Sequence, residues 1–180
     1  MITEKNIAAP LQAALADRGY ETLTPVQNAV IADEYDGQDL LVSAQTGSGK
    51  TVAFGLAFAS SVLDDEGHLV SDEFPSVLVI APTRELALQV KKELDWLYAL
   101  AGAKVISCVG GMDMRDERRA LGRGAHIVVG TPGRLVDHIR RGSLDMTDLQ
   151  SVVLDEADEM LNMGFREELE EILTAAPEER

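Results

Sequence analysis

The sequence is poor in the residues that build disulfide frameworks and metal centres. It contains a single cysteine, Cys108, which excludes an internal disulfide and favours a reducing compartment. Cys108 lies in an apolar run and is expected to be a small core residue. The three histidines, His68, His126 and His138, show none of the short spacings of metal ligands. We interpret them as structural or surface residues.

Long apolar runs are also missing. No stretch approaches the ~20 consecutive apolar residues of a membrane-spanning helix. Residues 1–6 lack the charged and then apolar regions of a secretory signal peptide. We therefore expect no membrane association and a cytoplasmic location. The 180 residues, with 46% hydrophobic content, suffice for one globular domain.

Positive charge is scarce, because 16 lysines and arginines face 31 acidic residues and the net charge is −15. This balance argues against bulk electrostatic attraction to nucleic acid. The basic residues are nevertheless clustered. Residues 115–123 form the most basic stretch, and Arg134, Arg140 and Arg141 follow. We hypothesise a modest basic path on one face; the alternative is the solvated side of an amphipathic helix.

A glycine-rich turn follows the apolar run at residues 39–43. Glycines let backbone N–H groups approach a phosphate closely, and a helix beginning at Lys50 adds further donors and a positive dipole. Lys50 is expected to reach the β- and γ-phosphates, and the Thr51 hydroxyl to ligate Mg²⁺. The alternative is a Gly/Ser turn with an accidental Lys-Thr pair. The predicted cradle comprises Ala44, Gln45, Thr46, Gly47, Ser48, Gly49, Lys50 and Thr51.

A second apolar run, at residues 151–154, ends in the tetrapeptide Asp-Glu-Ala-Asp at residues 155–158. Ligands of open parallel sheets bind beyond the carboxyl ends of the strands, so Asp155 and Glu156 are expected near Lys50. Asp155 suits Mg²⁺, and Glu156 suits orienting or deprotonating an attacking water. The alternative is the acidic first turn of an exposed helix. Together the two patterns predict a nucleoside triphosphatase core with Lys50, Asp155 and Glu156 as catalytic residues.

Further motifs make the chain resemble the first half of a DEAD-box RNA helicase, from about Ile7 to Phe165. Many motifs in one order make this resemblance specific. In chain order they are residues 19–27 for the Q motif, 44–51 for the phosphate loop, 81–87 for motif Ia, 110–111 for the paired glycines, 131–134 for motif Ib, 155–158 for the Asp-Glu-Ala-Asp motif and 163–165 after it.

The resemblance implies roles for individual residues. Adenine recognition would involve Tyr20, Thr22 and Gln27, and Asp158 would couple this domain to a second one. ATP and Mg²⁺ are the implied cofactors, with Thr51 and Asp155 as metal ligands. The implied partner is structured or ribosomal RNA, bound through its backbone. The implied RNA contacts are Pro82, Thr83, Arg84, Gly110, Gly111, Thr131, Pro132, Gly133 and Arg134.

Elementary chemistry supports several of these roles. The Gln27 amide can pair with adenine N6 and N7 together, whereas guanine presents two acceptors; an exposed helical glutamine is the alternative. Thr24-Pro25 and Thr131-Pro132 both read as an N-cap followed by proline at the first helical position. The second of these suits a phosphate, or serves only as a cap. Arg84 holds a phosphate or pairs with a carboxylate such as Glu85.

The sequence departs from the family at three places. Ala44 stands where the phosphate loop usually has glycine. Ile2 stands 17 positions before Gly19, where the family has an aromatic residue that stacks on adenine. Tyr20 is the nearest aromatic residue, and its alternative role is in the core or a hinge. No Ser-Ala-Thr motif follows, and the second RecA-like domain with its arginine fingers is absent. We therefore expect a monomeric fragment with weak nucleotide binding and negligible turnover.

The predicted fold is a doubly wound α/β domain of the RecA-like type. Its sheet is expected to be mainly parallel and covered on both faces, because the strand runs are continuously apolar. Residues 64–74 form the segment expected to be most flexible. The predicted strands are residues 40–44, 77–81, 104–109, 127–130 and 152–155. The predicted helices are residues 8–18, 25–33, 50–63, 84–101, 112–121, 132–141, 156–162 and 167–174.

The function implied by the resemblance is ATP-dependent RNA unwinding by the full-length protein. ATP would lie between the two domains, closure onto RNA would complete the site, and hydrolysis would release the RNA. Two alternatives stay open. One is a DNA-directed superfamily-two motor, against which Gln27 and the Asp-Glu-Ala-Asp motif argue. The other is a non-catalytic module that binds nucleotide or RNA, or docks a partner.

Overall fold

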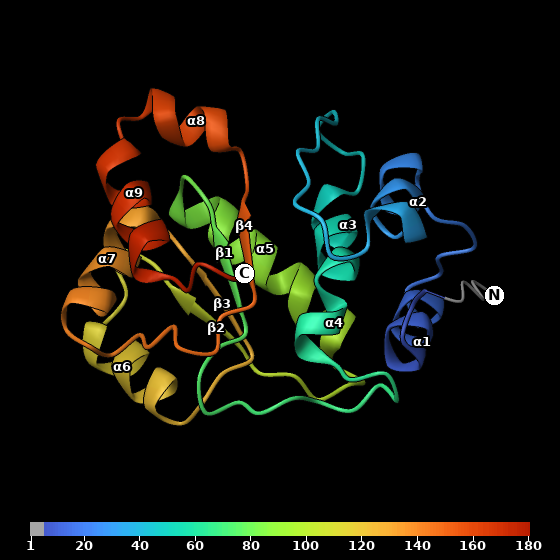
Figure 1. Cartoon of the computed structure of the whole chain (residues 1–180), viewed down its shortest axis with the longest axis horizontal. Helices are drawn as coiled ribbons and strands as arrows, with labels where there is room; N and C mark the ends of the chain where they lie inside the picture. Colours follow the sequence, from blue (N-terminus) through green and yellow to red (C-terminus); the bar gives the residue numbers. More distant parts are fainter. Residues whose placement is uncertain (1–5) are drawn as a thin grey trace.

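The computed structural model describes residues 6–180 as a parallel sheet with helices on both faces (Figure 1). The sheet has four strands in the order β2-β3-β1-β4, and every neighbouring pair is parallel. Parallel neighbours require crossover connections, which the helices supply. The predicted parallel α/β architecture is therefore confirmed. The strands are β1 (Val77–Ile80), β2 (Val105–Cys108), β3 (Ile127–Gly130) and β4 (Ser151–Leu154).

The helices lie close to their predicted bounds. The one predicted over residues 50–63 is interrupted at Phe58, whose ring stacks between those of Phe54 and Tyr98. The others differ from prediction by at most three residues at either end. The helices are α1 (Ala9–Asp17), α2 (Pro25–Val30), α3 (Lys50–Ala57), α4 (Ala59–Val62), α5 (Arg84–Tyr98), α6 (Met114–Gly122), α7 (Pro132–Arg140), α8 (Ala157–Asn162) and α9 (Arg166–Ala175), with a 3-10 turn η1 (Asp33–Tyr35).

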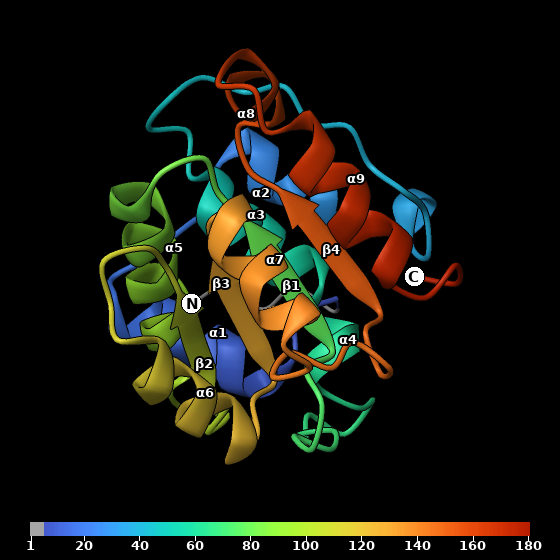
Figure 2. The ribbon, with the colours of Figure 1, turned by 90° about the vertical axis from the view of Figure 1, so that its left-hand side faces the viewer.

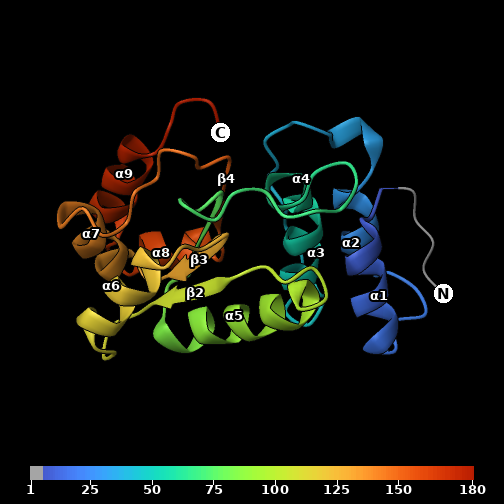
Figure 3. The ribbon, with the colours of Figure 1, turned by 90° about the horizontal axis from the view of Figure 1, so that it is seen from below.

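The sheet separates two hydrophobic cores. Val77 and Val79 of β1 face a cluster that includes residues of α1, α3 and α5. Leu78 and Ile80 face the opposite cluster, built with residues of α6, α7, α8 and α9. Figures 2 and 3 show these two helix groups on opposite sides of the strands. Burial on both faces explains why the strand sequences are continuously apolar.

The strand predicted at residues 40–44 is wrong. The segment is an extended connection without strand pairing among the described residues, and the Leu41 side chain is fully exposed. It leads toward α3 as the cyan loop of Figure 1. A strand needs a partner for its backbone donors and acceptors, and β4, at one edge of the sheet, pairs only with β1. Apolar composition alone therefore gave a false strand.

Residues 64–74 form a loop without regular helix, as predicted, and their flexibility stays a prediction. A single antiparallel bridge joins Leu63 to Leu69 across it. Within the described part of the chain, no helix combines the length and apolarity needed to cross a bilayer.

Candidate functional site

The carboxyl ends of the four strands lie at one level of the sheet. Ile80 is in register with both Gly130 and Leu154, and Gly130 is in register with Cys108. The alignment extends by one residue, because the Asp155 N–H donates to the Ile80 carbonyl at 2.9 Å. Segments that follow different strands are therefore brought to the same edge. This confirms the arrangement expected of an open parallel sheet.

The acidic pair follows β4 at this edge. Burial raises the pKa of Asp155, the neighbouring Glu156 raises it further, and the positive charge of Lys50 acts in the opposite direction. Lys50 is thus close enough to influence the Asp155 carboxyl, as the sequence predicts. Asp158 lies exposed in the first turn of α8.

Glu156 has an unusual backbone conformation. Its φ of 52° is the one positive φ of a non-glycine residue between positions 6 and 180. Such a conformation costs about 1–3 kcal/mol and persists where the surrounding structure enforces it, often at functional sites. Glu156 directly precedes α8 and its side chain is exposed. The strained turn places an exposed carboxylate next to the more buried Asp155.

The predicted phosphate cradle forms a turn that runs into α3. Gly47 and Gly49 have φ of 80° and 82°, values that favour glycine. Helix α3 begins at Lys50, as predicted, and no side chain caps its first N–H groups. The Ser48 hydroxyl is buried and has no hydrogen-bond partner in the described structure. Free N–H groups, an unpartnered hydroxyl and a lysine form a suitable site for a phosphate.

The remaining cradle residues complete this loop. Gln45 and Thr46 are exposed, and Ala44 and Thr51 are half-buried. The backbone φ of Ala44 is not positive, so this position does not require glycine. The Thr51 hydroxyl and the Asp155 carboxylate are hard oxygen ligands, which Mg²⁺ prefers. The donor set therefore fits a magnesium-bound nucleotide.

Gln27 is fully buried, so its interpretation as an exposed glutamine is wrong. Its Nε2 donates to the Gly49 carbonyl at 3.2 Å, and its Oε1 accepts from the Thr24 N–H at 3.0 Å. Thr24 caps α2 in return, as predicted for the Thr24-Pro25 pair. Gln27 therefore joins the start of α2 to the phosphate loop. Its reading of adenine stays a prediction.

Tyr20 and Thr22, the other two predicted adenine contacts, lie in different environments from the buried Gln27. The Tyr20 ring packs 5.9 Å from the ring of Trp96 and belongs to the periphery of one hydrophobic core. This packing supports the alternative of a core residue for Tyr20. Thr22 is exposed in the connection before α2. Ile2 lies outside the described residues.

Two arginines converge on the loop that contains Gly110 and Gly111. A Cβ added to Gly111 would lie 2.5 Å from Arg84 Nη1, so the guanidinium covers this glycine. Arg134 Nη1 donates to the Met112 carbonyl at 3.1 Å. In the described structure Arg84 forms no ion pair, which removes the carboxylate alternative. The three segments with implied RNA contacts therefore meet at the same edge.

The helix starts at this edge resemble each other but are capped differently. Thr83 caps α5 by accepting from the Leu86 N–H at 3.2 Å. Thr131 occupies the N-cap position of α7, yet its hydroxyl makes no capping bond. Pro82 and Pro132 are buried, while Gly133 is exposed. The start of α7 therefore keeps unpaired donors suited to a phosphate oxygen.

One buried carboxylate, Glu117, links these segments. It accepts hydrogen bonds from the Val109 N–H at 2.8 Å, from Arg134 Nη1 at 2.9 Å and from His138 Nε2 at 2.8 Å. The second ring nitrogen of His138 pairs with the Ser143 hydroxyl. Burial alone would raise the pKa of Glu117, but the hydrogen bonds and the charge of Arg134 outweigh it, and the pKa is lowered.

The sequence interpretation missed Glu117, because it belongs to the most basic stretch of the chain. One signal was available. Glu117 precedes the buried Leu121 by four residues, so both lie on the same stripe of α6. A carboxylate on a buried stripe requires partners, and these come from Val109, directly after β2, and from α7.

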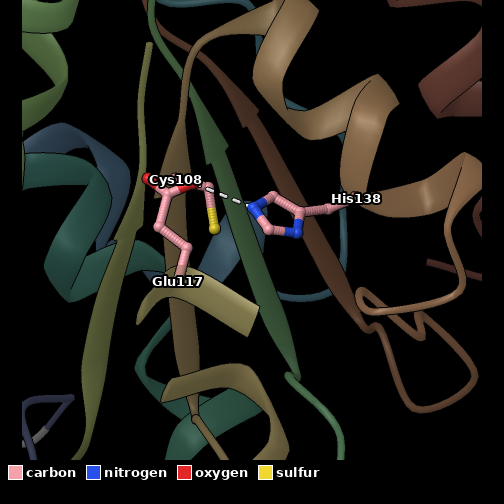
Figure 4. Close-up of side chains that lie close together, drawn as sticks. All are labelled: Cys108, Glu117 and His138. Carbon is pink, nitrogen blue, oxygen red and sulfur yellow. Dashed lines mark hydrogen bonds and ion pairs between the residues drawn. The ribbon is translucent and has the colours of Figure 1, made fainter. Parts of the chain in front are cut away.

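Cys108, Glu117 and His138 lie close together (Figure 4), with potential ligand atoms within 4.8 Å of one another. Burial is the main cause that raises the pKa of Cys108 to about 12, so the thiol stays protonated. Both oxygens of Glu117 already accept hydrogen bonds, one of them from the guanidinium of Arg134. We interpret the group as a hydrogen-bonded polar cluster rather than a metal centre.

Comparisons with known proteins agree with this geometry. A family model described as DEAD/DEAH box helicase matches residues 24–180. The chain is 45% identical to the DEAD-box ATP-dependent RNA helicase CshA of Streptococcus pneumoniae, covering 98% of this chain and 33% of that protein. It is 47% identical to the ATP-dependent RNA helicase DeaD of Escherichia coli, covering 96% and 27%.

A solved structure is similar as well. The crystal structure of a DEAD box protein from the hyperthermophile Methanococcus jannaschii superposes with a TM-score of 0.85 at 36% identity, covering 97% of this chain and 47% of that one. The chain spans about a third of the length of the curated relatives it matches.

Proposed function

Because the chain belongs to the DEAD/DEAH box helicase family, we propose that it binds ATP and serves, within a longer protein, in ATP-dependent unwinding of RNA. The relatives named above are described as ATP-dependent RNA helicases. The RecA-like fold supports the same assignment. A second RecA-like domain is the proposed partner that completes the ATP site and the RNA surface.

One observation carries the catalytic part of this proposal. Lys50 of the phosphate loop, about 100 residues before the acidic pair in sequence, lies close enough for its positive charge to act on the Asp155 carboxyl directly after β4. Lys50 and the first N–H groups of α3 hold the phosphates, and Glu156 orients or deprotonates the attacking water. Mg²⁺, when bound by Thr51 and Asp155, supplies neutralisation of the charge that develops on the phosphate oxygens.

The nucleic-acid part rests on the neighbouring segments. Arg84, the Gly110–Gly111 turn and the start of α7 present guanidinium and backbone donors on the same edge. Donors of this kind contact phosphates and carry no sequence information. We therefore propose that these donors contact the sugar-phosphate backbone of the RNA strand. Such contacts need only a few local guanidinium and N–H groups, so they are compatible with the negative net charge of the chain.

Calorimetric titration with Mg·ADP and Mg·GDP tests nucleotide binding, using the chain, Gln27→Ala and Asn28→Ala. Selective ADP binding that is lost in Gln27→Ala is the expected result. Asn28 is the matched control, because it is exposed and on the same helix. Equal binding of both nucleotides would remove the role of Gln27 in base selection. No binding by a chain that is folded by circular dichroism would remove the ATP site itself.

ATP hydrolysis tests the enzymatic part. We expect negligible turnover by the 180 residues alone, because the arginine fingers of a second domain contribute about 10³–10⁵ in rate. A longer protein carrying this chain should be stimulated more by oligo(U) than by oligo(dT). Stronger stimulation by DNA would support the superfamily-two DNA motor instead. A cytoplasmic location stays a prediction.

A further inference from the structure

The positive residues are unevenly distributed along the chain. Seven of the sixteen lysines and arginines lie between residues 115 and 141, where three acidic residues occur. This part of the chain forms α6, β3 and α7. A locally positive region in a chain of net charge −15 is the starting point for the inference.

Ion pairs account for some of these arginines. Arg119 contacts Asp116 at 3.3 Å, and Arg140 contacts Glu171 at 2.7 Å. Arg134 is held by the buried Glu117. The hypothesis of a basic path did not distinguish these three paired arginines from unpaired ones. The structure shows that their charges are already matched by neighbouring carboxylates.

The other four arginines of this region, Arg115, Arg118, Arg123 and Arg141, are exposed and form no ion pair within residues 6–180. Arg115, Arg118 and Arg141, together with Asp113 and Met114, line one hollow between α6 and the end of α7. Arg115 and Arg118 are three residues apart, so they lie on one side of α6. Arg141, the C-cap of α7, approaches from the neighbouring helix.

The one acidic residue of the hollow is engaged locally. Asp113 is the N-cap of α6, and its carboxylate accepts the Arg115 backbone N–H at 2.7 Å. Its negative charge at the N-terminus of α6 also interacts favourably with the helix dipole. Three guanidinium groups around one hollow repel each other unless an anion lies among them. Guanidinium groups bind phosphates in a bidentate manner, which favours phosphate over a simple halide.

The position of the hollow identifies the source of the phosphate. Helix α6 begins three residues after Gly111, and α7 begins with the Thr131-Pro132 pair. The hollow therefore adjoins one of the segments assigned to the RNA backbone, the Gly110–Gly111 turn, while the Thr131-Pro132 pair lies at the other end of α7 from Arg141. A strand crossing the Gly110–Gly111 turn can extend along α6 without leaving the surface.

We propose that Arg115, Arg118 and Arg141 form an additional phosphate-binding site that extends the RNA surface beyond the family's motifs. This inference rests on the proposed function, since it requires RNA to cross the Gly110–Gly111 turn. The occupant is the sugar-phosphate backbone of single-stranded RNA. An acidic protein segment is the competing occupant.

Nuclear magnetic resonance titration of the chain with short oligo(U) locates the contact, even when binding is weak. The expected result is a shift of the Arg115, Arg118 and Arg141 signals together with those of Gly110 and Thr131. Shifts at Gly110 and Thr131 alone would overturn the additional site and leave the proposed function standing. Shifts at neither group would overturn RNA binding by this domain as well.

A charge-matched pair of triple variants tests the contribution of these side chains to affinity. The test variant carries Arg115→Gln, Arg118→Gln and Arg141→Gln. The control carries Arg119→Gln, Arg140→Gln and Arg166→Gln, and it loses the same net charge from arginines that already have ion pairs.

The readout is the slope of log Kd against log salt for oligo(U). Each lost phosphate contact changes this slope by about 0.7 for a single strand, so the test variant should lower its magnitude by about 2. The control should keep the original slope. Equal slopes for the test variant and the unmodified chain would overturn the proposal. Titration with polyglutamate that shifts the three arginines as strongly as oligo(U) would reassign the site to acidic proteins.

Discussion

At the scale of single residues, Gly49 has two separate reasons to be glycine. Its φ is 82°, and an added Cβ would lie 2.4 Å from Gln27 Nε2. Gly47 has a similar φ of 80° but has nothing within 4 Å of an added Cβ. The two positions therefore separate the effect of backbone strain from the effect of the contact with Gln27.

Gly49→Ala is expected to lower both stability and nucleotide affinity. The backbone effect should cost about 1 kcal/mol, and displacement of Gln27 should add to it. In stability, Gly47→Ala should show the backbone effect alone. Urea unfolding measures stability, and calorimetry with Mg·ADP measures nucleotide affinity. Equal losses of stability in the two variants would show that the Gln27 contact does not stabilise the loop.

Asp155→Asn should separate stability from function. Burial and the adjacent Glu156 raise the pKa of Asp155, so its ionised form is less favourable in the folded chain than in the unfolded chain. Removing the charge should therefore raise the melting temperature at neutral pH, while magnesium-dependent nucleotide binding falls. Thermal unfolding with and without Mg·ADP measures both effects. A lower melting temperature of the variant would contradict this account of Asp155.

At the scale of elements, α6 and α7 are joined through Glu117. The hydrogen bonds that lower its pKa favour the ionised form in the folded chain. The stabilisation is present above the unfolded pKa of about 4.3 and is lost as the pH falls through the lower folded pKa. Breaking this link should loosen α7 from the Gly110–Gly111 turn.

Glu117→Gln should reduce stability by about 2 kcal/mol at neutral pH, because Arg134 and His138 lose a charged acceptor. The difference from the unmodified chain should shrink as the pH falls below about 4. Asp116→Asn is the control, since its pair with Arg119 is exposed and should contribute under about 0.5 kcal/mol. Urea unfolding at several pH values measures the difference. A difference independent of pH would refute the assigned ionisation.

The sequence predicted the elements where local pattern and tertiary context agree. The four strands of the sheet are short apolar runs, fully buried in β1 and β3 and half-buried throughout β4, and their bounds are confirmed to within one residue. The run at residues 40–44 has the same composition, but its pairing depends on a neighbour that composition cannot report. The helix break coincides with the packing of the Phe58 ring between those of Phe54 in α3 and Tyr98 in α5, a tertiary contact that sequence periodicity does not report.

In the candidate site, too, local pattern predicted some features and tertiary contacts decided others. Motif spacing predicted that Asp155 would lie near Lys50, and in the structure the charge of Lys50 acts on the Asp155 carboxyl. Spacing could not predict that Gln27 is tied to Gly49, because that contact joins residues far apart in sequence. Charge pattern placed the arginines of α6 and α7 on one path, but only the geometry separates paired from unpaired guanidinium groups.

At the scale of the whole molecule, three consecutive apolar side chains are exposed at residues 40–42. Leu41 is fully exposed, Leu40 and Val42 are also exposed, and β4 is an edge strand of the sheet. Uncovered apolar runs and strand edges promote association between chains. A monomer is thus expected only in dilute solution.

Leu41→Lys should reduce association at high protein concentration without changing the fold. Leu100→Lys is a matched control, because Leu100 is also exposed but lies beyond the end of α5. Static light scattering over a concentration series measures the apparent mass, and circular dichroism confirms folding. Equal association of both variants would mean that residues 40–42 do not mediate contact between chains.

The burial of Cys108 makes the chain suitable for single-site chemical labelling. Its thiol is fully enclosed and has a raised pKa, so maleimide reagents should leave it unmodified in the folded chain. Glu66 lies in the exposed loop at residues 64–74, before β1 and at the opposite end of the sheet from the phosphate loop and the RNA-binding segments. A fluorophore attached through Glu66→Cys would therefore report rotation and tumbling of the domain while both binding regions remain free.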